Sequence, residues 1–322
     1  MTNEPFASVV MAAHNSAATI GQAIGSVLLQ TRHDWELIVV DDGSTDSTAA
    51  IASSFDDARI RVVGQENRGP AAARNAGLRL ARAPLVSTLD SDDLWLPDYL
   101  AVMGRALEAA PEAALAYTDA WVLDDATGRI RKTTEMAWQE PPDPPPEEPG
   151  AFFEELLRRN FVYNSVSARR DVLLALGGYD ERLLTGEDWE LWLRVAASGA
   201  RCVRAPGILG VHRDHAHSLS ADTRRMRAGK LEVYRIVERD WETDDGVRAL
   251  ARALRLACQR SSRRDELTGA ALVLPRLVRR WLRRRTAWRR QPPREVANLL
   301  GAVDDVLRRD LPTTPARPPK TA

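Results

Sequence analysis

Two acidic clusters in the first hundred residues are the strongest chemical signal in this chain. Asp41 and Asp42 end one short apolar run, and Asp90, Asp92 and Asp93 follow another. Carboxylates at the carboxyl ends of strands are where an open α/β sheet holds its ligand. Adjacent hard oxygen ligands suit Mg²⁺ or Mn²⁺, and such a cation suits a diphosphate. The two clusters therefore predict a substrate activated by a nucleoside diphosphate.

The segments around these clusters alternate between strand-like and helix-like patterns. Apolar runs predict strands at residues 6–12, 35–40, 60–63 and 84–89, and helical patterns lie between them at 20–28, 51–55 and 69–83. This order is typical of a doubly wound α/β fold with a mostly parallel sheet flanked by helices. The run at 35–40 is almost continuously apolar, which predicts a strand buried on both faces. Asn15 and Ser16 are expected to cap the first helix.

The composition is that of a globular protein without a disulfide framework. The chain has 322 residues and is 44% hydrophobic, enough for one large domain or two modest ones. Cys202 and Cys258 are the only cysteines, which predicts buried thiols in a reducing compartment. Residues 1–5 lack the pattern of a signal peptide, and no run of about 18 apolar residues occurs. We therefore expect a cytoplasmic protein that does not span a membrane.

The net charge of zero hides an asymmetry between the two ends of the chain. Residues 1–224 carry 21 basic and 33 acidic side chains, whereas residues 225–322 carry 24 and 12. The stretch from Arg276 to Arg290 is rich in Arg, Leu and Trp and has no acidic residue, which predicts a basic amphipathic helix. Docking on the acidic part, peripheral contact with the inner face of a membrane and binding of another acidic partner remain open. No nucleic acid is expected.

Five short motifs occur in an order and at distances that match a known enzyme family. They cover residues 9–15, 36–46, 67–77, 90–93 and 186–188. Together they resemble family 2 glycosyltransferases of the GT-A fold, over roughly residues 5–222. The resemblance implies an inverting transfer of a sugar from a nucleotide-diphosphate donor to an acceptor hydroxyl, with Mn²⁺ or Mg²⁺ as cofactor. It also implies a saccharide or lipid-linked acceptor and a role in polysaccharide, glycolipid or glycoconjugate synthesis.

The first strand end and the Asp-Asp-Gly-Ser turn correspond to the family's nucleoside site. The resemblance assigns base and ribose contacts to Ala12, His14, Asn15, Asp41 and Asp42. Many relatives have Pro or Thr at position 12 and Tyr at position 14, so this chain departs from the common pattern there. A histidine can still stack on a base, and a UDP-sugar is the expected donor. His14 could instead cap the helix that follows.

Residues 90–93 correspond to the family's metal motif. Three carboxylates within four residues repel one another, and a divalent cation would relieve that repulsion while bridging the donor phosphates. Asp92 is the expected principal ligand, and Asp90 or Asp93 assists it. Asp90 is also assigned to the donor site. In the competing interpretation, Asp90 or Asp93 only caps a helix that begins near residue 94.

Two further segments are expected beside the diphosphate. Asn67 and Arg74 belong to the motif that borders it in the family, and the Arg74 guanidinium could bind phosphate oxygens in bidentate geometry. Arg213 and His215 match a Tyr-Arg-x-His pattern, and are expected at the departing diphosphate or around the metal. The histidines of residues 212–217 could alternatively form a separate zinc site, although that stretch has no Cys ligand.

The motif at residues 186–188 corresponds to the acidic pair of inverting members. The resemblance makes Asp188 the general base that deprotonates the acceptor hydroxyl. A purely structural role as a helix cap is the alternative. Trp189 and Trp192 lie three residues apart on one side of a predicted helix, which favours the core for Trp192 over a sugar-stacking surface.

These assignments divide the chain into three regions. A GT-A glycosyltransferase domain is expected at residues 1–222 with a proline-rich loop at 139–149, followed by a helical, Arg-rich region at 223–311 and a disordered tail at 312–322. A catalytically silent nucleotide-sugar-binding or scaffold protein, which uses the basic tail for assembly, is the alternative function. The presence of Asp42, Asp92 and Asp188 together favours the enzyme.

Overall fold

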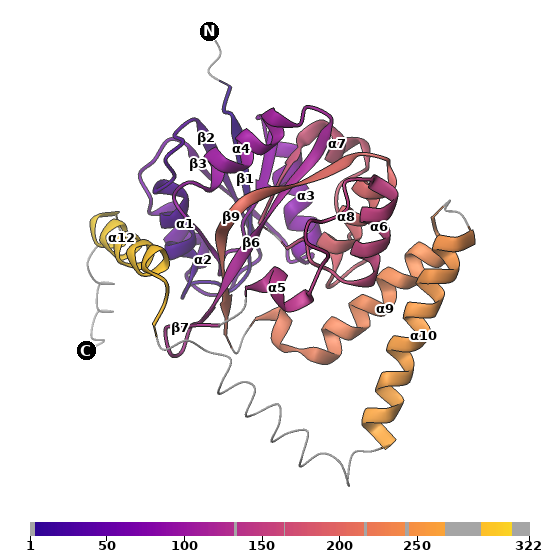
Figure 1. The fold of residues 1–322 in the computed structure, drawn as a ribbon. Helices are drawn as coiled ribbons and strands as arrows, with labels where there is room; N and C mark the ends of the chain where they lie inside the picture. The colour runs from indigo at the N-terminus through magenta and orange to yellow at the C-terminus, as the bar shows by residue number, and fades with distance from the viewer. Residues whose placement is uncertain are drawn as a thin grey trace.

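The computed structural model describes residues 4–131, 134–163, 165–215, 218–241, 245–267 and 291–310 (Figure 1). The strands are β1 (Ala7–Ala13), β2 (Trp35–Asp42), β3 (Ile60–Gln65), β4 (Leu85–Thr88), β5 (Leu94–Trp95), β6 (Ala113–Asp124), β7 (Arg129–Ile130), β8 (Val166–Arg169) and β9 (Arg201–Asp214). The helices are α1 (Ile20–Leu28), α2 (Thr48–Ser53), α3 (Pro70–Leu80), α4 (Tyr99–Ala109), α5 (Glu135–Gln139), α6 (Pro149–Arg158), α7 (Arg170–Ala175), α8 (Glu187–Ala197), α9 (Thr223–Arg239), α10 (Asp245–Leu267) and α12 (Arg294–Asp310), with a 3₁₀ turn η1 at Leu219–Ala221.

One sheet of nine strands organises the described chain. Its order is β3-β2-β1-β4-β8-β6-β9-β5, and β7 pairs with the end of β6. Strands β8 and β5 are antiparallel to their neighbours, whereas β1, β2, β3, β4, β6 and β9 all run in one direction. The predicted doubly wound, mostly parallel GT-A sheet is confirmed. Its topology brings the carboxyl ends of six strands, where the acidic clusters lie, to one edge.

Helices cover both faces of this sheet, as the apolar sequence of β2 predicts. All eight residues of β2 are buried. Ile38 and Val40 face a core shared with α3, α6 and α8, and Leu37 and Val39 face a second core shared with α1, α2 and α4. Each fully buried aliphatic side chain contributes about 1.5–3 kcal/mol to stability. The two cores therefore fix the strand ends that carry the candidate site.

Three local expectations are wrong. The residue before α1 is Thr19, which has no side-chain capping bond, and the Asn15 side chain binds a different loop. Helix α2 ends at Ser53, so Phe55 lies beyond it. Residues 94–95 form strand β5 paired with β9, and the next helix begins only at Tyr99. Tertiary partners override the local helix signal in each of these places.

The chain beyond residue 222 also packs on the sheet domain. Helix α9 buries Val233 and Val237 in the same core as α8. Helix α12 lies beside α1, at the other side of the molecule from α10 (Figure 1). The proline-rich segment 139–149 connects α5 to α6. The predicted basic helix from Arg276 to Arg290 and the tail at 312–322 lie outside the described residues. None of the described helices has the length and apolar character needed to cross a bilayer.

Candidate active site

The carboxylate of Asp42 is the fixed point of the loops around the β2 end. Its Oδ1 accepts hydrogen bonds from Gln65 Nε2 at 2.7 Å and from the Arg68 amide at 2.9 Å, and its Oδ2 accepts from the Gly69 amide at 2.8 Å. The backbone carbonyl of Asp42 accepts from His14 Nδ1 at 2.9 Å. Asp42 thus connects the ends of β1, β2 and β3 through hydrogen bonds.

The β1 loop and the Asp-Asp-Gly-Ser turn are interlocked. Asn15, which has a positive φ of 50°, accepts from the Thr45 amide at 2.8 Å through its side chain. The side-chain nitrogen of Asn67 lies 3.2 Å from both ring nitrogens of His14. Gly43 has a φ of +69°, and a Cβ there would lie 2.8 Å from the Asn67 amide nitrogen. Because only glycine fits, the turn can hold Asn67 and the exposed His14 ring at the rim of the site.

Asp41 differs from Asp42 in having a free acceptor. Its side chain is buried, and Oδ1 has no hydrogen-bond partner among the described residues. The half-buried Ala12 lies beside it at the end of β1, where Ala13 is in register with Asp41. An unsatisfied buried oxygen is costly. A donor-binding role for Asp41 stays a prediction.

The second acidic cluster follows β4 and has the geometry of a cation site. Asp90, Asp92 and Asp93 each offer a carboxylate oxygen, and these oxygens all lie within 4.8 Å of one another. Three hard oxygen donors at this spacing fit Mg²⁺ or Mn²⁺. Because β5 follows the cluster in place of a helix, the helix-cap interpretation of Asp90 and Asp93 is wrong.

The end of β9 supplies the partners of this cluster. Asp93 Oδ1 accepts from the Arg213 amide at 2.9 Å, and its Oδ2 lies 3.3 Å from His212 Nδ1. Asp92 Oδ2 lies 2.9 Å from His215 Nε2. The two described histidines of residues 212–217 thus face different aspartates. They do not share a ligand set of the kind that a closed zinc site requires, and His217 lies outside the described residues.

Charge and burial act differently on the four ionisable groups near the β9 end. Burial alone would raise the pKa of Asp92, but the hydrogen bond from His215 and the charges of His212 and His215 outweigh it and lower that pKa. Burial raises the pKa of Asp93 to about 6. The Asp93 carboxylate in turn raises the pKa of His212 to about 10 against the effect of burial, and Asp92 raises the pKa of His215. Positive charge is thus held beside a cluster that repels itself.

Arg74 connects this cluster with the first turn of α8. Its guanidinium donates from Nη2 to Asp90 Oδ1 at 2.7 Å and from Nη1 to Glu187 Oε1. The side chain is buried, and the two carboxylates raise the pKa of Arg74 despite the opposing effect of burial. The expected contact of Arg74 with a diphosphate stays a prediction. In this structure the residue also joins two acidic groups from distant parts of the chain.

Asp188 lies in the first turn of α8, next to Glu187. Its Oδ1 accepts from the Trp189 amide at 2.7 Å, and the side chain is half-buried. Burial and the adjacent Glu187 raise the pKa of Asp188 to about 7, although the charge of Arg74 opposes them. A carboxylate with a pKa near neutrality is a suitable general base, because it accepts a proton readily and is still ionised at working pH.

The two tryptophans after Asp188 belong to the core. Trp189 is 3% exposed and donates from Nε1 to the Leu156 carbonyl at 2.9 Å, and Trp192 is 1% exposed. The core prediction for Trp192 is confirmed. The sugar-stacking alternative is wrong for both residues, because neither ring has an accessible face.

Arg213 is buried and faces the metal cluster. It donates from Nε to the Asp92 carbonyl at 2.8 Å and from Nη2 to Gln22 Oε1 at 2.6 Å, and Nη1 binds Asp125. Arg213 thus lies beside the acidic cluster, and its expected role near a metal or diphosphate stays a prediction. Neither Gln22 nor Asp125 was expected from the sequence, because a single polar residue on a helix or after a strand has no distinguishing pattern.

The part of the site that includes Asp42, Arg74 and the acidic cluster at residues 90–93 lies in a segment that matches a known family. The family described as "Glycosyl transferase family 2" matches residues 8–167. The succinoglycan biosynthesis proteins ExoO and ExoU of Rhizobium meliloti are 38% identical over 209 residues and 34% identical over 239 residues. This chain belongs to glycosyltransferase family 2. The alignments cover 63% and 69% of this chain, and 59% and 66% of the two relatives' own lengths.

Solved structures show the same fold. TarS 1-349 of S. aureus, solved in complex with UDP-GlcNAc, aligns with a TM-score of 0.62 at 16% identity, over 92% of this chain and 81% of that one. The mannosyltransferase PcManGT from Pyrobaculum calidifontis, solved with GDP-Man and Mn²⁺, aligns with a TM-score of 0.57 at 21% identity, over 95% and 88%. At these identities the likeness concerns the GT-A fold.

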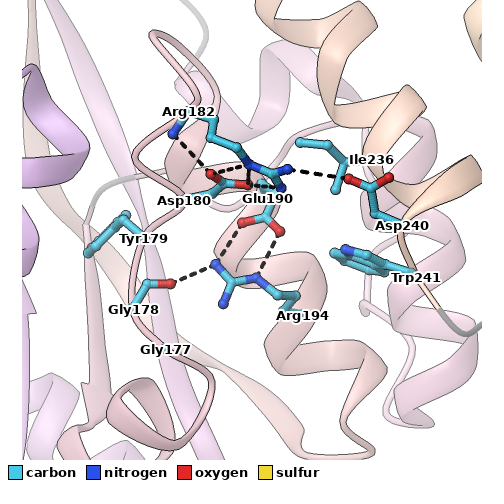
Figure 2. A pocket seen from close by; sticks show the side chains of 10 residues that line it. All are labelled: Gly177, Gly178, Tyr179, Asp180, Arg182, Glu190, Arg194, Ile236, Asp240 and Trp241. Carbon is cyan, nitrogen blue, oxygen red and sulfur yellow. Dashed lines mark hydrogen bonds and ion pairs between the residues drawn. The ribbon is translucent and has the colours of Figure 1, made fainter.

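A cavity of about 340 Å³ lies beside α8 and the end of α9 (Figure 2). It is lined by Gly177, Gly178, Tyr179, Asp180, Arg182, Glu190, Arg194, Ile236, Asp240 and Trp241. Its charged groups bind one another, since Arg182 lies 2.7 Å from Asp180 and Arg194 lies 2.7 Å from Glu190. None of the predicted site residues lines it. The cavity is therefore separate from the candidate active site.

Proposed function

We propose that this glycosyltransferase moves a sugar from a nucleoside-diphosphate donor to an acceptor hydroxyl, with inversion and with a divalent cation. The observation that carries the proposal is the bridge by Arg74 between Asp90 of the acidic cluster and Glu187 beside Asp188. Donor activation and proton transfer need different carboxylates in one site. Through Arg74, the acidic cluster and the first turn of α8, which are far apart in the sequence, contact the same guanidinium.

The donor is proposed to be a UDP-sugar. The unpartnered Oδ1 of Asp41 would accept the ring N–H of uracil, and the exposed His14 ring would stack on the base. Asp42, Asn15 and Asn67 would hold the ribose and the loops around it.

Asp92, Asp90 and Asp93 would hold Mn²⁺ or Mg²⁺. The cation, when bound, would neutralise the negative charge that develops on the departing nucleoside diphosphate. His215 would keep Asp92 in place through its 2.9 Å contact, and Arg213 would keep the turn in place through the Asp92 carbonyl. A bound cation would relieve the charge repulsion among the three aspartates, and this would favour cation binding.

Asp188 would act as the general base. It would take the proton of the acceptor hydroxyl while that oxygen attacks C1 of the donor sugar from the face opposite the diphosphate. The new C1–O bond forms as the C1–O bond to phosphate breaks, so the configuration at C1 inverts. Glu187 and burial keep the pKa of Asp188 near neutrality, which suits this proton transfer.

The acceptor is proposed to be a saccharide or a lipid-linked saccharide in polysaccharide synthesis. A relative in Escherichia coli, the UDP-Glc:alpha-D-GlcNAc-diphosphoundecaprenol beta-1,3-glucosyltransferase WfgD, is 42% identical over 94 residues, which is 29% of this chain. A lipid-linked acceptor would place the enzyme at the inner face of a membrane, where the Arg276 to Arg290 segment could bind anionic lipid. Replacing Arg279, Arg280, Arg283 and Arg284 by Ser should then reduce sedimentation with anionic liposomes. Unchanged sedimentation would contradict the membrane role.

The direct test is a screen of donors. UDP- and GDP-sugars would be incubated with the full chain and Mn²⁺ or Mg²⁺, and nucleoside diphosphate release would be measured. Turnover of a UDP-sugar that depends on the cation and is lost in Asp188→Asn supports the proposal. Binding of the donors without turnover would instead favour the silent binding protein, and no binding of any nucleotide would contradict both.

A further inference from the structure

Helix α12 contributes to the part of the core beneath the acidic cluster. Val296, Leu299 and Val303 are 0%, 2% and 0% exposed and belong to one apolar cluster with Leu94 and Val211. Leu94 follows Asp93 directly, and Val211 precedes His212. The helix therefore shares one apolar cluster with the two strands, β5 and β9, that adjoin the acidic cluster and its histidine partners.

The fit between α12 and α1 is close. A Cβ on Gly25 of α1 would lie 3.2 Å from Val303 Cγ1, which leaves no room for a larger residue without movement. At the other end of the contact, Trp121 Nε1 donates to Glu295 Oε1 at 3.0 Å. Packing with this complementarity fixes the position of α1 relative to β5 and β6.

A series of hydrogen bonds connects α12 to the acidic cluster at residues 90–93. The half-buried Gln22 of α1 donates from Nε2 to Asp304 Oδ1 of α12 at 3.5 Å. Its other side-chain atom, Oε1, accepts from Arg213 Nη2 at 2.6 Å, and Arg213 Nε donates to the Asp92 carbonyl at 2.8 Å. Gln22 is thus a two-sided link between α12 and the arginine that holds the Asp92 backbone.

We propose that Gln22 is a positioning residue for the divalent cation, and that α12 braces it from the far end of the chain. Without its carboxamide oxygen, Arg213 keeps only the exposed Asp125 as a side-chain acceptor among the residues that the structure describes. The turn that presents Asp92 and Asp93 then loses part of its support. Partners that orient metal ligands typically change metal affinity by about 10–100-fold when removed. This inference rests on the metal dependence of the proposed function.

The first experiment measures Mn²⁺ binding to the full chain by electron paramagnetic resonance, without any sugar donor. Gln22→Leu should raise the Kd for Mn²⁺ by about tenfold, while its melting temperature without metal stays close to that of the unmodified protein. Gln22→Glu keeps an acceptor for Arg213 and should restore most of the affinity. Equal Mn²⁺ affinity in Gln22→Leu and the unmodified protein would overturn the inference. If the unmodified protein binds no Mn²⁺, the proposed metal dependence itself fails.

The second experiment tests the link to α12. Asp304→Leu should weaken Mn²⁺ binding, whereas Asp305→Leu, the same change at the exposed neighbouring position, should not. Coupling of this kind is reciprocal, so Mn²⁺ should slow hydrogen exchange of the amides in residues 294–310. Identical effects of the two substitutions, together with exchange that is insensitive to Mn²⁺, would show that α12 only packs and does not brace the site.

Discussion

Arg74 Nη2 lies 2.7 Å from Asp90 Oδ1, in a side chain that is 6% exposed and that also binds Glu187. A guanidinium is suited to this position because its donors form a rigid planar fork. Asp90 belongs to the candidate donor site, and Glu187 directly precedes the candidate base Asp188. Their distance and relative orientation therefore depend on one residue of α3.

Replacement of Arg74 should destabilise the protein strongly. Arg74→Met leaves Glu187 buried without its partner, and breaking a buried pair costs about 3–5 kcal/mol. The free energy of unfolding in urea measures the change. Arg68→Met is the matched control, because Arg68 pairs with Glu181 at the surface and such pairs contribute about 0–1 kcal/mol. Equal effects of the two substitutions would mean that the Arg74 bridge has no special role.

Asp188→Asn should remove the proton acceptor and leave the donor site intact. General base catalysis contributes about 10²–10⁴-fold, so turnover should fall by that factor. Calorimetric titration with UDP and Mn²⁺ should give a Kd close to that of the unmodified protein. Asp171→Asn, an exposed carboxylate of α7, is the control and should retain full turnover. Normal turnover in Asp188→Asn would remove Asp188 from the base role.

The rate should depend on pH through Asp188. Its pKa is raised to about 7 by burial and by Glu187, and only the ionised form accepts a proton. We expect kcat/KM to rise with pH and to level off above about pH 7. Glu187→Gln removes the neighbouring negative charge and leaves Arg74 less neutralised, and both effects lower the pKa of Asp188. The rising limb should move to lower pH, and a limb that does not move would contradict this origin.

The same pKa shift predicts a loss of stability at high pH in the unmodified protein. The folded pKa of Asp188, about 7, lies above the ordinary value, so the folded state binds a proton more tightly than the unfolded state. The stabilisation that protonated Asp188 gives the folded state is complete below about pH 4 and is lost as the pH rises through 7. Asp188→Asn stays neutral, and its melting temperature should exceed that of the unmodified protein at pH 8 more than at pH 5. A difference that is the same at both pH values would argue against a raised pKa.

Chelation should stop the reaction. Removal of divalent ions takes away the cation proposed to neutralise the departing diphosphate, so transfer should disappear with chelator and return with Mn²⁺. Asp92→Asn should weaken Mn²⁺ binding measured by electron paramagnetic resonance, because it removes a charged ligand. Asp56→Asn, at an exposed position away from the cluster, should not change it. Transfer at a normal rate in excess chelator would contradict the metal assignment.

Much of the fold follows from local patterns. The apolar run at 35–40 predicts a strand buried on both faces, and all eight residues of β2 are buried. The acidic residues after β2 and β4 mark the carboxyl edge of the sheet, because parallel strands carry their ends to the same side. The order of motifs identifies the family, since five short patterns in sequence are specific even though each is weak.

These local patterns do not predict which distant side chains pair with one another. Arg74 and Glu187 are 113 positions apart, His215 and Asp92 are 123 apart, and Gln22 and Arg213 are 191 apart. Local periodicity carries no information about which distant polar groups meet, because that depends on how the helices pack on the sheet. The helix-cap interpretation of Asp93 was wrong for the same reason, since β9 offers it an amide and a histidine. The chain order thus specifies the elements and the carboxylates at their ends, and only the packing of β9, α3, α8 and α12 decides how those carboxylates are held.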